Sequence, residues 1–235
     1  FIVPGNGGFI MQRIIDYSYL LQSMLGKPGK NIIGSFQLSQ INSSSVQAQL
    51  KAAGIDTNSN QYKAVMREMM KNANGAMFTN PTAIKNLMSQ YDADGDYINP
   101  RTGLAGLLVT EENMASKNRI IPIPESSREE MFELTKREFL RENGVANGDT
   151  TKRSDVYTNL YRKMQKNDRL AAGHTLEQYE RAYTRAFVEA AKAADPSWEV
   201  GKPIQPGALE HITRESVEEG LRQSNSSFTT LNRKI

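Results

Sequence analysis

An acidic, glycine-centred run holds the residues of this chain that are best suited to chemistry. Asp92, Asp94 and Asp96 stand at alternate positions, and carboxylates at positions one, three and five are ligands of an EF-hand-type calcium loop. Such a loop also needs glycine at its sixth position and a bidentate glutamate at its twelfth, where this chain has Tyr97 and Gly103. The three aspartates are therefore a candidate calcium loop that lacks its strongest ligand.

The same run can instead close a β-hairpin. Asp94 followed by Gly95 suits a two-residue type I′ turn, in which both central residues need positive φ. That turn would pair Tyr91 with Ile98, an aromatic residue beside a β-branched one on the same face. Because the hairpin accounts for more residues than the calcium loop, the sequence predicts a short hairpin near 91–98 and no metal site.

The remaining polar residues form no recognisable catalytic set. His174 could bind a metal with Glu177 and Glu180 only if the helix bent the three together, and His211 stands alone before a predicted helix. The chain has no His-Glu-x-x-His motif, no phosphate-binding glycine loop and no nucleophile elbow. We therefore predict no catalytic and no cofactor-binding residue. The alternative is an enzyme whose site is assembled from scattered residues: Asp149, His174, Glu177, Glu180 and Arg181.

Composition narrows the class of protein. The 235 residues are 38% hydrophobic and 23% charged, which is typical of a soluble globular chain, and no run approaches the ~20 apolar residues of a membrane span. The absence of cysteine excludes disulfides and thiolate sites. The opening residues lack a basic leader and a long apolar core, so no signal peptide is expected, and Met11 could be the biological start. We expect a cytoplasmic protein, with export without a classical signal peptide as the alternative.

A nucleic-acid partner is not expected. The net charge is only +3, and acidic residues alternate with basic ones along the predicted helices. Binding would need clustered positive charge with stacking aromatics or a groove-reading motif. The nearest candidate surrounds one predicted helix and is more typical of a solvated face: Lys152, Arg153, Arg162, Lys163, Lys166 and Arg169.

The N-terminal residues predict an amphipathic arm. Ile14, Tyr17, Leu21 and Met24 share one side of a helix over 11–25, and a linker rich in glycine, serine, asparagine and glutamine follows. An apolar face must be buried, so this arm either folds back on its own core or docks on another molecule. Self-association or a protein partner is the expected consequence.

Periodicity and capping residues predict helices along most of the remaining chain. Gly54 can end a helix in the left-handed conformation, and Asn80 with Pro81 can open one. Capping boxes predict helix starts at Ser127 and Thr175. The predicted helices cover 45–53, 59–72, 80–90 and 213–222, with others starting at Ser127, Ser154 and Thr175. The helix from Thr175 has the most regular apolar stripe: Leu176, Tyr179, Tyr183, Phe187, Ala190 and Ala194.

The resulting fold class is mainly α. We expect a multi-helix domain with one short β-hairpin and an N-terminal amphipathic helical arm. The predicted organisation is an extension with its arm and linker over 1–41, a helical domain over 42–222 and a flexible tail over 223–235.

Several short segments carry a family resemblance. They are QYKA at 61–64, NGAM at 74–77, the run 91–107, NRII at 118–121, REFL at 137–140, NGDTT at 147–151, EQYER at 177–181 and ITRES at 212–216. Together they resemble a family of uncharacterised proteins from low-GC Gram-positive bacteria, catalogued only as a domain of unknown function. The resemblance covers roughly 42–222 and implies no activity, cofactor or catalytic residue.

The function expected from these observations is that of a non-enzymatic structural or protein-interaction protein of bacteria. A calcium-stabilised extracellular module is the other alternative, beside the scattered-site enzyme.

Overall fold

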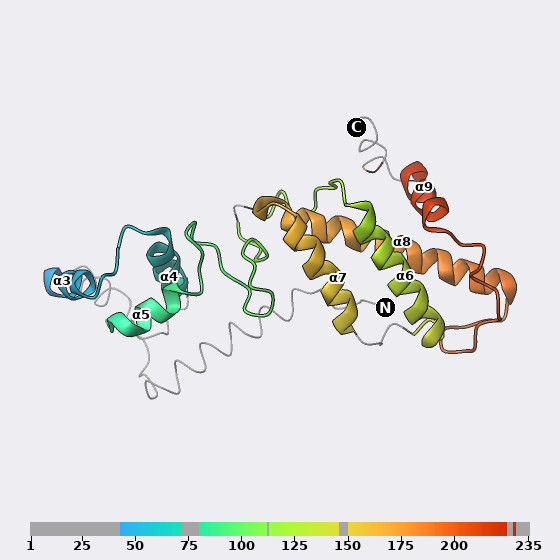
Figure 1. Cartoon of the computed structure of the whole chain (residues 1–235), viewed down its shortest axis with the longest axis horizontal. Coiled ribbons are helices and arrows are strands. Elements are labelled where there is room, and N and C mark those ends of the chain that lie inside the picture. Colours follow the sequence, from blue (N-terminus) through green and yellow to red (C-terminus); the bar gives the residue numbers. More distant parts are fainter. Residues whose placement is uncertain (1–42, 72–79, 112, 146–149, 225–227, 229–235) are drawn as a thin grey trace. The chain divides into compact units, whose positions relative to one another are not determined.

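The computed structural model describes residues 43–71, 80–111, 113–145, 150–224 and 228 (Figure 1). The predicted arm over 11–25 lies outside these residues. The chain divides into two compact units, Phe1–Leu108 and Val109–Ile235. The described part contains seven α-helices and no β-strand, so the mainly α fold class is confirmed.

Three helices form the described part of the Phe1–Leu108 unit: α3 (Ser44–Ala52), α4 (Asn60–Lys71) and α5 (Pro81–Met88). Their ends follow local signals. Gly54 has a φ of +72° just beyond α3, as a left-handed helix terminator should. The side chain of Asn80 accepts hydrogen bonds from the backbone N–H groups of Thr82 and Ala83 at 2.9 and 3.3 Å. All three predicted helices are therefore confirmed.

The predicted β-hairpin over 91–98 is wrong. Only isolated bridges join this segment, and Tyr91 pairs with Tyr97 rather than with Ile98. A type I′ turn does not form, because Gly95 has positive φ while Asp94 does not. The backbone oxygen of Asp92 accepts from the N–H of Gly95 at 2.9 Å, so the chain turns one residue earlier than the hairpin required. Turn hydrogen bonds accepted by Asp92 take the place of the predicted strand pairing.

The Val109–Ile235 unit is built on one long helix. Its elements are α6 (Glu125–Arg141), α7 (Thr150–Lys163), the 3-10 helix η1 (Lys166–Asp168), α8 (Arg169–Ala194) and α9 (Arg214–Ser224). Figure 1 shows α6 and α7 side by side against α8. The predicted stripe of α8 is buried from Leu176 to Ala190, and only Ala194 at its end is exposed. Phe228 is buried against Tyr179, with ring centroids 5.1 Å apart.

Aromatic side chains fill the space between α6 and α8. The ring of Phe132 lies edge-on to that of Tyr183, with the ring centroids 5.2 Å apart, and its centroid is 5.5 Å from that of Phe187. Phe139 contacts Phe187 at 5.6 Å and Trp198 at 6.0 Å. The indole N–H of Trp198 donates to a backbone oxygen, so this buried ring keeps its polar atom paired.

The capping-box predictions in this unit are wrong. α6 begins at Glu125 and α8 at Arg169, so Ser127 and Thr175 lie inside helices and are buried. The Thr175 hydroxyl donates to the backbone oxygen of Ala171 at 2.8 Å, a bond that satisfies a buried threonine within a helix. Ser154, also predicted as a cap, lies within α7. The three side chains therefore lie within helices that begin earlier, and none of them caps a helix start.

A close approach between α7 and α8 gives a testable prediction. A Cβ added at Gly173 would lie 2.5 Å from the Tyr161 hydroxyl oxygen, and burial raises the pKa of that hydroxyl to about 12. We expect Gly173→Ala to destabilise the protein by about 1–3 kcal/mol, although alanine favours a helix by ~1 kcal/mol over glycine.

Chemical unfolding of Gly173→Ala and of Gly173→Ala/Tyr161→Phe would test this clash. The second variant removes the obstructing oxygen and should recover most of the lost stability. Equal stabilities of the two variants would show that the hydroxyl is not the obstacle.

Candidate functional site

Buried charges gather where α9 meets α6 and α8. The side chain of Glu218 is only 2% exposed, and it accepts hydrogen bonds from Arg128 and from the Tyr183 hydroxyl, the latter at 2.7 Å. Arg214, which is 6% exposed, donates to the same carboxylate at 3.2 Å. Burial raises the pKa of Tyr183, so its hydroxyl stays protonated and remains a donor to Glu218.

Arg214 holds three further carboxylates at the surface of this cluster. It donates to Glu129 at 2.6 Å, to Glu125 at 2.7 Å and to Glu215 at 2.6 Å. Burial alone would lower the pKa of Arg214, but its hydrogen bonds to Glu129 and Glu125 and the negative charge of Glu215 raise it above its ordinary value. The guanidinium is therefore a permanent cation that joins α9 to the first turns of α6.

A second network joins α6, α7 and α8. Arg153 on α7 donates to Glu138 at 2.6 Å and to Glu180 at 3.0 Å. The Tyr157 hydroxyl completes the set by donating to Glu180 at 2.8 Å, and burial, followed by the Glu180 charge, raises the pKa of Tyr157. Glu138 is 3% exposed, and its second oxygen has no hydrogen-bond partner among the described residues.

Both networks fit a structural role better than a catalytic one. Each buried carboxylate is held by one or more guanidinium groups, and such charge-assisted bonds are short and directional. A catalytic acid or base must instead face a cleft in which a substrate can reach it. These bonds fix the helices relative to one another, and removing one member would leave a buried charge unpaired.

The scattered residues of the enzyme alternative are not brought together. Glu180 belongs to the second network, whereas Glu177 pairs with Arg181 on the exposed side of α8 at 2.6 Å. His174 is half-buried within α8, not ahead of a helix start at Thr175 as the sequence predicted. Asp149 lies outside the described residues. Within the described ranges, His174, Glu177 and Glu180 do not approach closely enough to share a metal ion.

The acidic loop does bring its three carboxylates together. One oxygen each from Asp92, Asp94 and Asp96 lies within 4.8 Å of the others. Asp92 Oδ1 accepts the backbone N–H groups of Asp94 and Asp96 at 3.1 and 2.9 Å. A Cβ on Gly95 would lie 2.8 Å from the backbone oxygen of Asn60, so the loop rests against the first turn of α4. Three carboxylates supply part of the six to eight oxygens that calcium takes.

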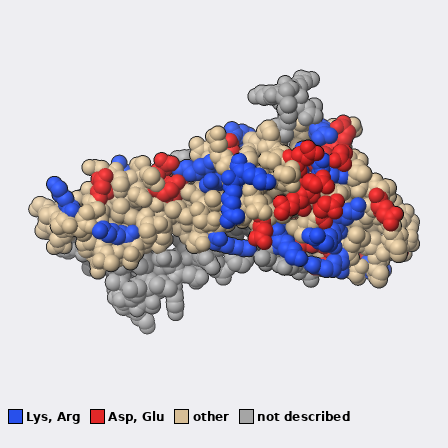
Figure 2. Space-filling view, in the orientation of Figure 1, with Lys and Arg blue, Asp and Glu red and all other residues tan. Residues whose placement is uncertain are grey.

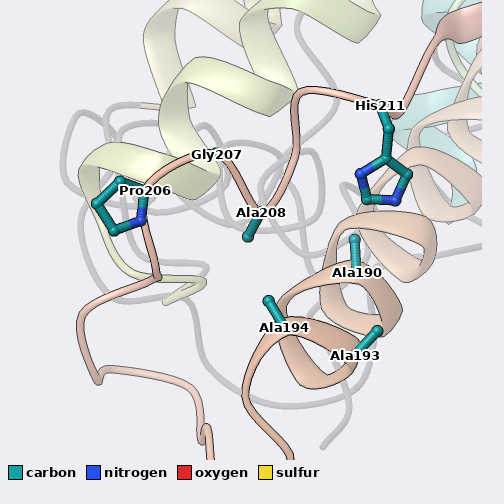
Figure 3. Close-up of a pocket in the computed structure, with 7 residues that line it drawn as sticks. All are labelled: Ala190, Ala193, Ala194, Pro206, Gly207, Ala208 and His211. Atoms are coloured by element: carbon teal, nitrogen blue, oxygen red, sulfur yellow. The ribbon is translucent and has the colours of Figure 1, made fainter.

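A shallow depression lies at the C-terminal end of α8 (Figure 3). Small side chains dominate its lining, and the one imidazole there belongs to His211. A substrate pocket is usually deeper and combines an apolar wall with several convergent polar groups. The depression is lined by Ala190, Ala193, Ala194, Pro206, Gly207, Ala208 and His211.

The basic residues singled out from the sequence do not form one open cationic surface. Arg153 is bound by Glu138 and Glu180, and Arg169 donates to the backbone oxygen of Tyr161 at 3.1 Å. Such pairing leaves fewer charges for a phosphate backbone.

Among the described helices, none is long and apolar enough to cross a membrane.

Comparison with known proteins gives one match. A family model described as a domain of unknown function (DUF3879) matches residues 55–235. No curated protein and no solved structure matches the chain. The function of this protein is therefore unknown, and the structure has to supply the argument.

Proposed function

Since this chain belongs to the family of domains of unknown function DUF3879 over residues 55–235, we propose from its own structure that it is a non-enzymatic structural or protein-interaction protein. The observation that carries the proposal is that the buried carboxylates are paired with arginine or tyrosine side chains. Glu138, Glu180 and Glu218 are each engaged by arginine or tyrosine within the two networks. This use of buried charge to hold helices together supports a structural role.

We further propose that residues 11–25 make such a contact. Their apolar side chains recur at helical spacing, and an amphipathic helix on a linker can pack into the groove of a partner or of a second copy. The division into an arm over 1–41, a domain over 42–222 and a tail over 223–235 remains part of this proposal.

Deleting residues 1–41 and measuring the mass in solution would test the role of the arm. We expect the full chain to associate and the truncated chain to lose that association or some of its thermal stability. An unchanged monomer with unchanged stability would remove the idea that the arm docks.

The source and compartment belong to the proposal as well. The resemblance points to low-GC Gram-positive bacteria, and a chain without cysteine suits the cytoplasm. Nucleic acid is not among the proposed partners, since the net charge is only +3.

A calcium-stabilised extracellular module is the second candidate. The proximity of Asp92, Asp94 and Asp96 favours it, while Gly103 at the twelfth position counts against it because it supplies no side-chain ligand. If the loop binds calcium, saturation at a hundredfold excess over Kd should stabilise the folded protein by ~2.7 kcal/mol.

Thermal unfolding followed by circular dichroism, with and without millimolar calcium, would measure this shift. Asp94→Asn should abolish it, whereas Asp56→Asn, at an exposed aspartate outside the loop, should retain it. An identical melting temperature with and without calcium would contradict the calcium proposal.

A further inference from the structure

The exposed side of α6 has an acidic half and a basic half, so two copies of it can complement each other in charge. On its exposed side, residues recur at intervals of four and three: Ser126, Glu130, Glu133, Arg137 and Leu140. Residues at this spacing form one stripe along the helix, the stripe that a lengthwise neighbour would contact. We propose that α6 docks on α6 of a second copy of this chain, as an antiparallel pair with two-fold symmetry.

Charge along α6 gives the pair its direction. Figure 2 shows acidic side chains gathered over the N-terminal half of α6 and basic ones over its C-terminal half. Glu130 and Glu133 belong to the first group, and Arg137 and Arg141 to the second. An antiparallel neighbour places each acidic half over a basic half, whereas a parallel one would place like charges together.

Symmetry fixes the register of the proposed contact. With the two-fold axis on the exposed face midway between Glu133 and Arg137, Glu133 faces Arg137 of the second copy, and the same ion pair forms again on the other side of the axis. Glu130 faces Leu140 of the second copy, so the aliphatic stem of the glutamate can cover the leucine.

The residues at the centre of this face have no competing partners. Glu133 and Arg137 stand four apart with the acid first, the order that favours an ion pair within one helix. In the described part of the chain, however, neither side chain forms an ion pair or hydrogen bond. Glu129 differs because Arg214 holds it. Leu140 is 44% exposed, among the most exposed large apolar side chains of the described ranges.

The helix dipole also favours acids at the start of α6 and bases at its end. The dipole alone, however, does not explain the exposure of Leu140. A single pair of helices buries an area at the small end of protein interfaces, so the expected dimer is reversible and weakened by salt. This inference rests on the proposed protein-interaction function and names a second copy as its partner.

Sedimentation equilibrium of the full chain over rising concentration, in low and high salt, would test the pair. Glu133→Arg or Arg137→Glu replaces two attractive contacts by two repulsive ones, and each should raise the dimer Kd roughly tenfold or more. The double variant Glu133→Arg/Arg137→Glu restores opposite charges and should return Kd to near that of the native chain. The matched control is Glu199→Arg/Lys202→Glu, an exposed ion pair outside α6, which should leave Kd unchanged.

A distance between spin labels would test the orientation. In the antiparallel register, labels on Ser126→Cys should lie about 28 Å apart, from the rise of 1.5 Å per residue and the spacing of packed helices. A parallel pair would hold them about 10 Å apart.

A chain that stays monomeric at all concentrations would overturn the inference. The inference would also be overturned if neither charge reversal changed the dimer Kd, or if the double variant failed to regain association. If those variants leave the dimer Kd unchanged while deletion of residues 1–41 abolishes association, the inference fails and the proposed function stands.

Discussion

Replacing Glu218 by alanine is expected to destabilise the Val109–Ile235 unit by about 3–5 kcal/mol, the usual result of removing one partner from a buried ion pair. The carboxylate is only 2% exposed and receives hydrogen bonds from Arg128, Tyr183 and Arg214. Without it, the buried Tyr183 hydroxyl loses its acceptor, and Arg128 loses its carboxylate partner. Part of the loss should appear as detachment of α9, because this carboxylate joins α9 to both α6 and α8.

Trp198, which is the sole tryptophan of the chain and is buried in the same unit, provides the measurement through its fluorescence in urea. Glu218→Gln keeps the shape and one acceptor, so its loss should be smaller than that of Glu218→Ala and isolates the contribution of the charge. Glu219→Ala is the control, because its neighbouring side chain is 54% exposed and exposed pairs contribute little. Similar stabilities of the Glu218 and Glu219 variants would contradict a structural role for the buried network.

Local signals predicted much of the fold. Asn80 with Pro81, and Gly54 beyond its helix, act through their own backbone geometry, and such signals depend little on what packs around them. The apolar stripe of α8 was equally visible, because Tyr179, Tyr183 and Phe187 share one side of any helix that contains them. These predictions needed no knowledge of the tertiary structure.

Signals that depend on packing misled the sequence analysis. Ser127 and Thr175 have the spacing of capping boxes, but a hydroxyl that is buried inside a helix has the same sequence signature. The Asp94-Gly95 pair suits a hairpin turn, yet Asp92 closes the loop with its own carboxylate. Thr175 and Asp92 found hydrogen-bond partners that the sequence alone does not show, and Ser127 is buried inside its helix.

The ion-pair networks were missed for the same reason. The sequence marks Glu180 only as a possible catalytic or metal-binding residue, and it does not distinguish Glu138, Arg214 or Glu218 from surface charges. Charged residues on helices usually lie on a solvated face, and only the packing of four helices carries these inward. The one available signal was the spacing of Arg214 and Glu218, which stand four apart on one helix.

Replacing Phe187 by alanine is expected to cost about 3–5 kcal/mol of stability, because it removes a fully buried aromatic ring and leaves a cavity. The ring is 0% exposed and lies between Phe132 and Phe139 of α6. Its removal would therefore weaken the contact between α6 and α8 without touching any charge. Urea unfolding followed by circular dichroism would measure the loss, since Trp198 lies near the altered site through Phe139.

Phe187→Leu fills most of the same space and should lose clearly less stability than Phe187→Ala, because the cost depends on the volume left empty. Val200→Ala is the surface control, since Val200 is 58% exposed, and it should change stability by no more than about 0.5 kcal/mol. If Phe187→Ala were as stable as this control, the aromatic layer could not be what holds α6 on α8. The two ion-pair networks would then have to hold these helices together, and Glu218→Ala should prove the more damaging substitution.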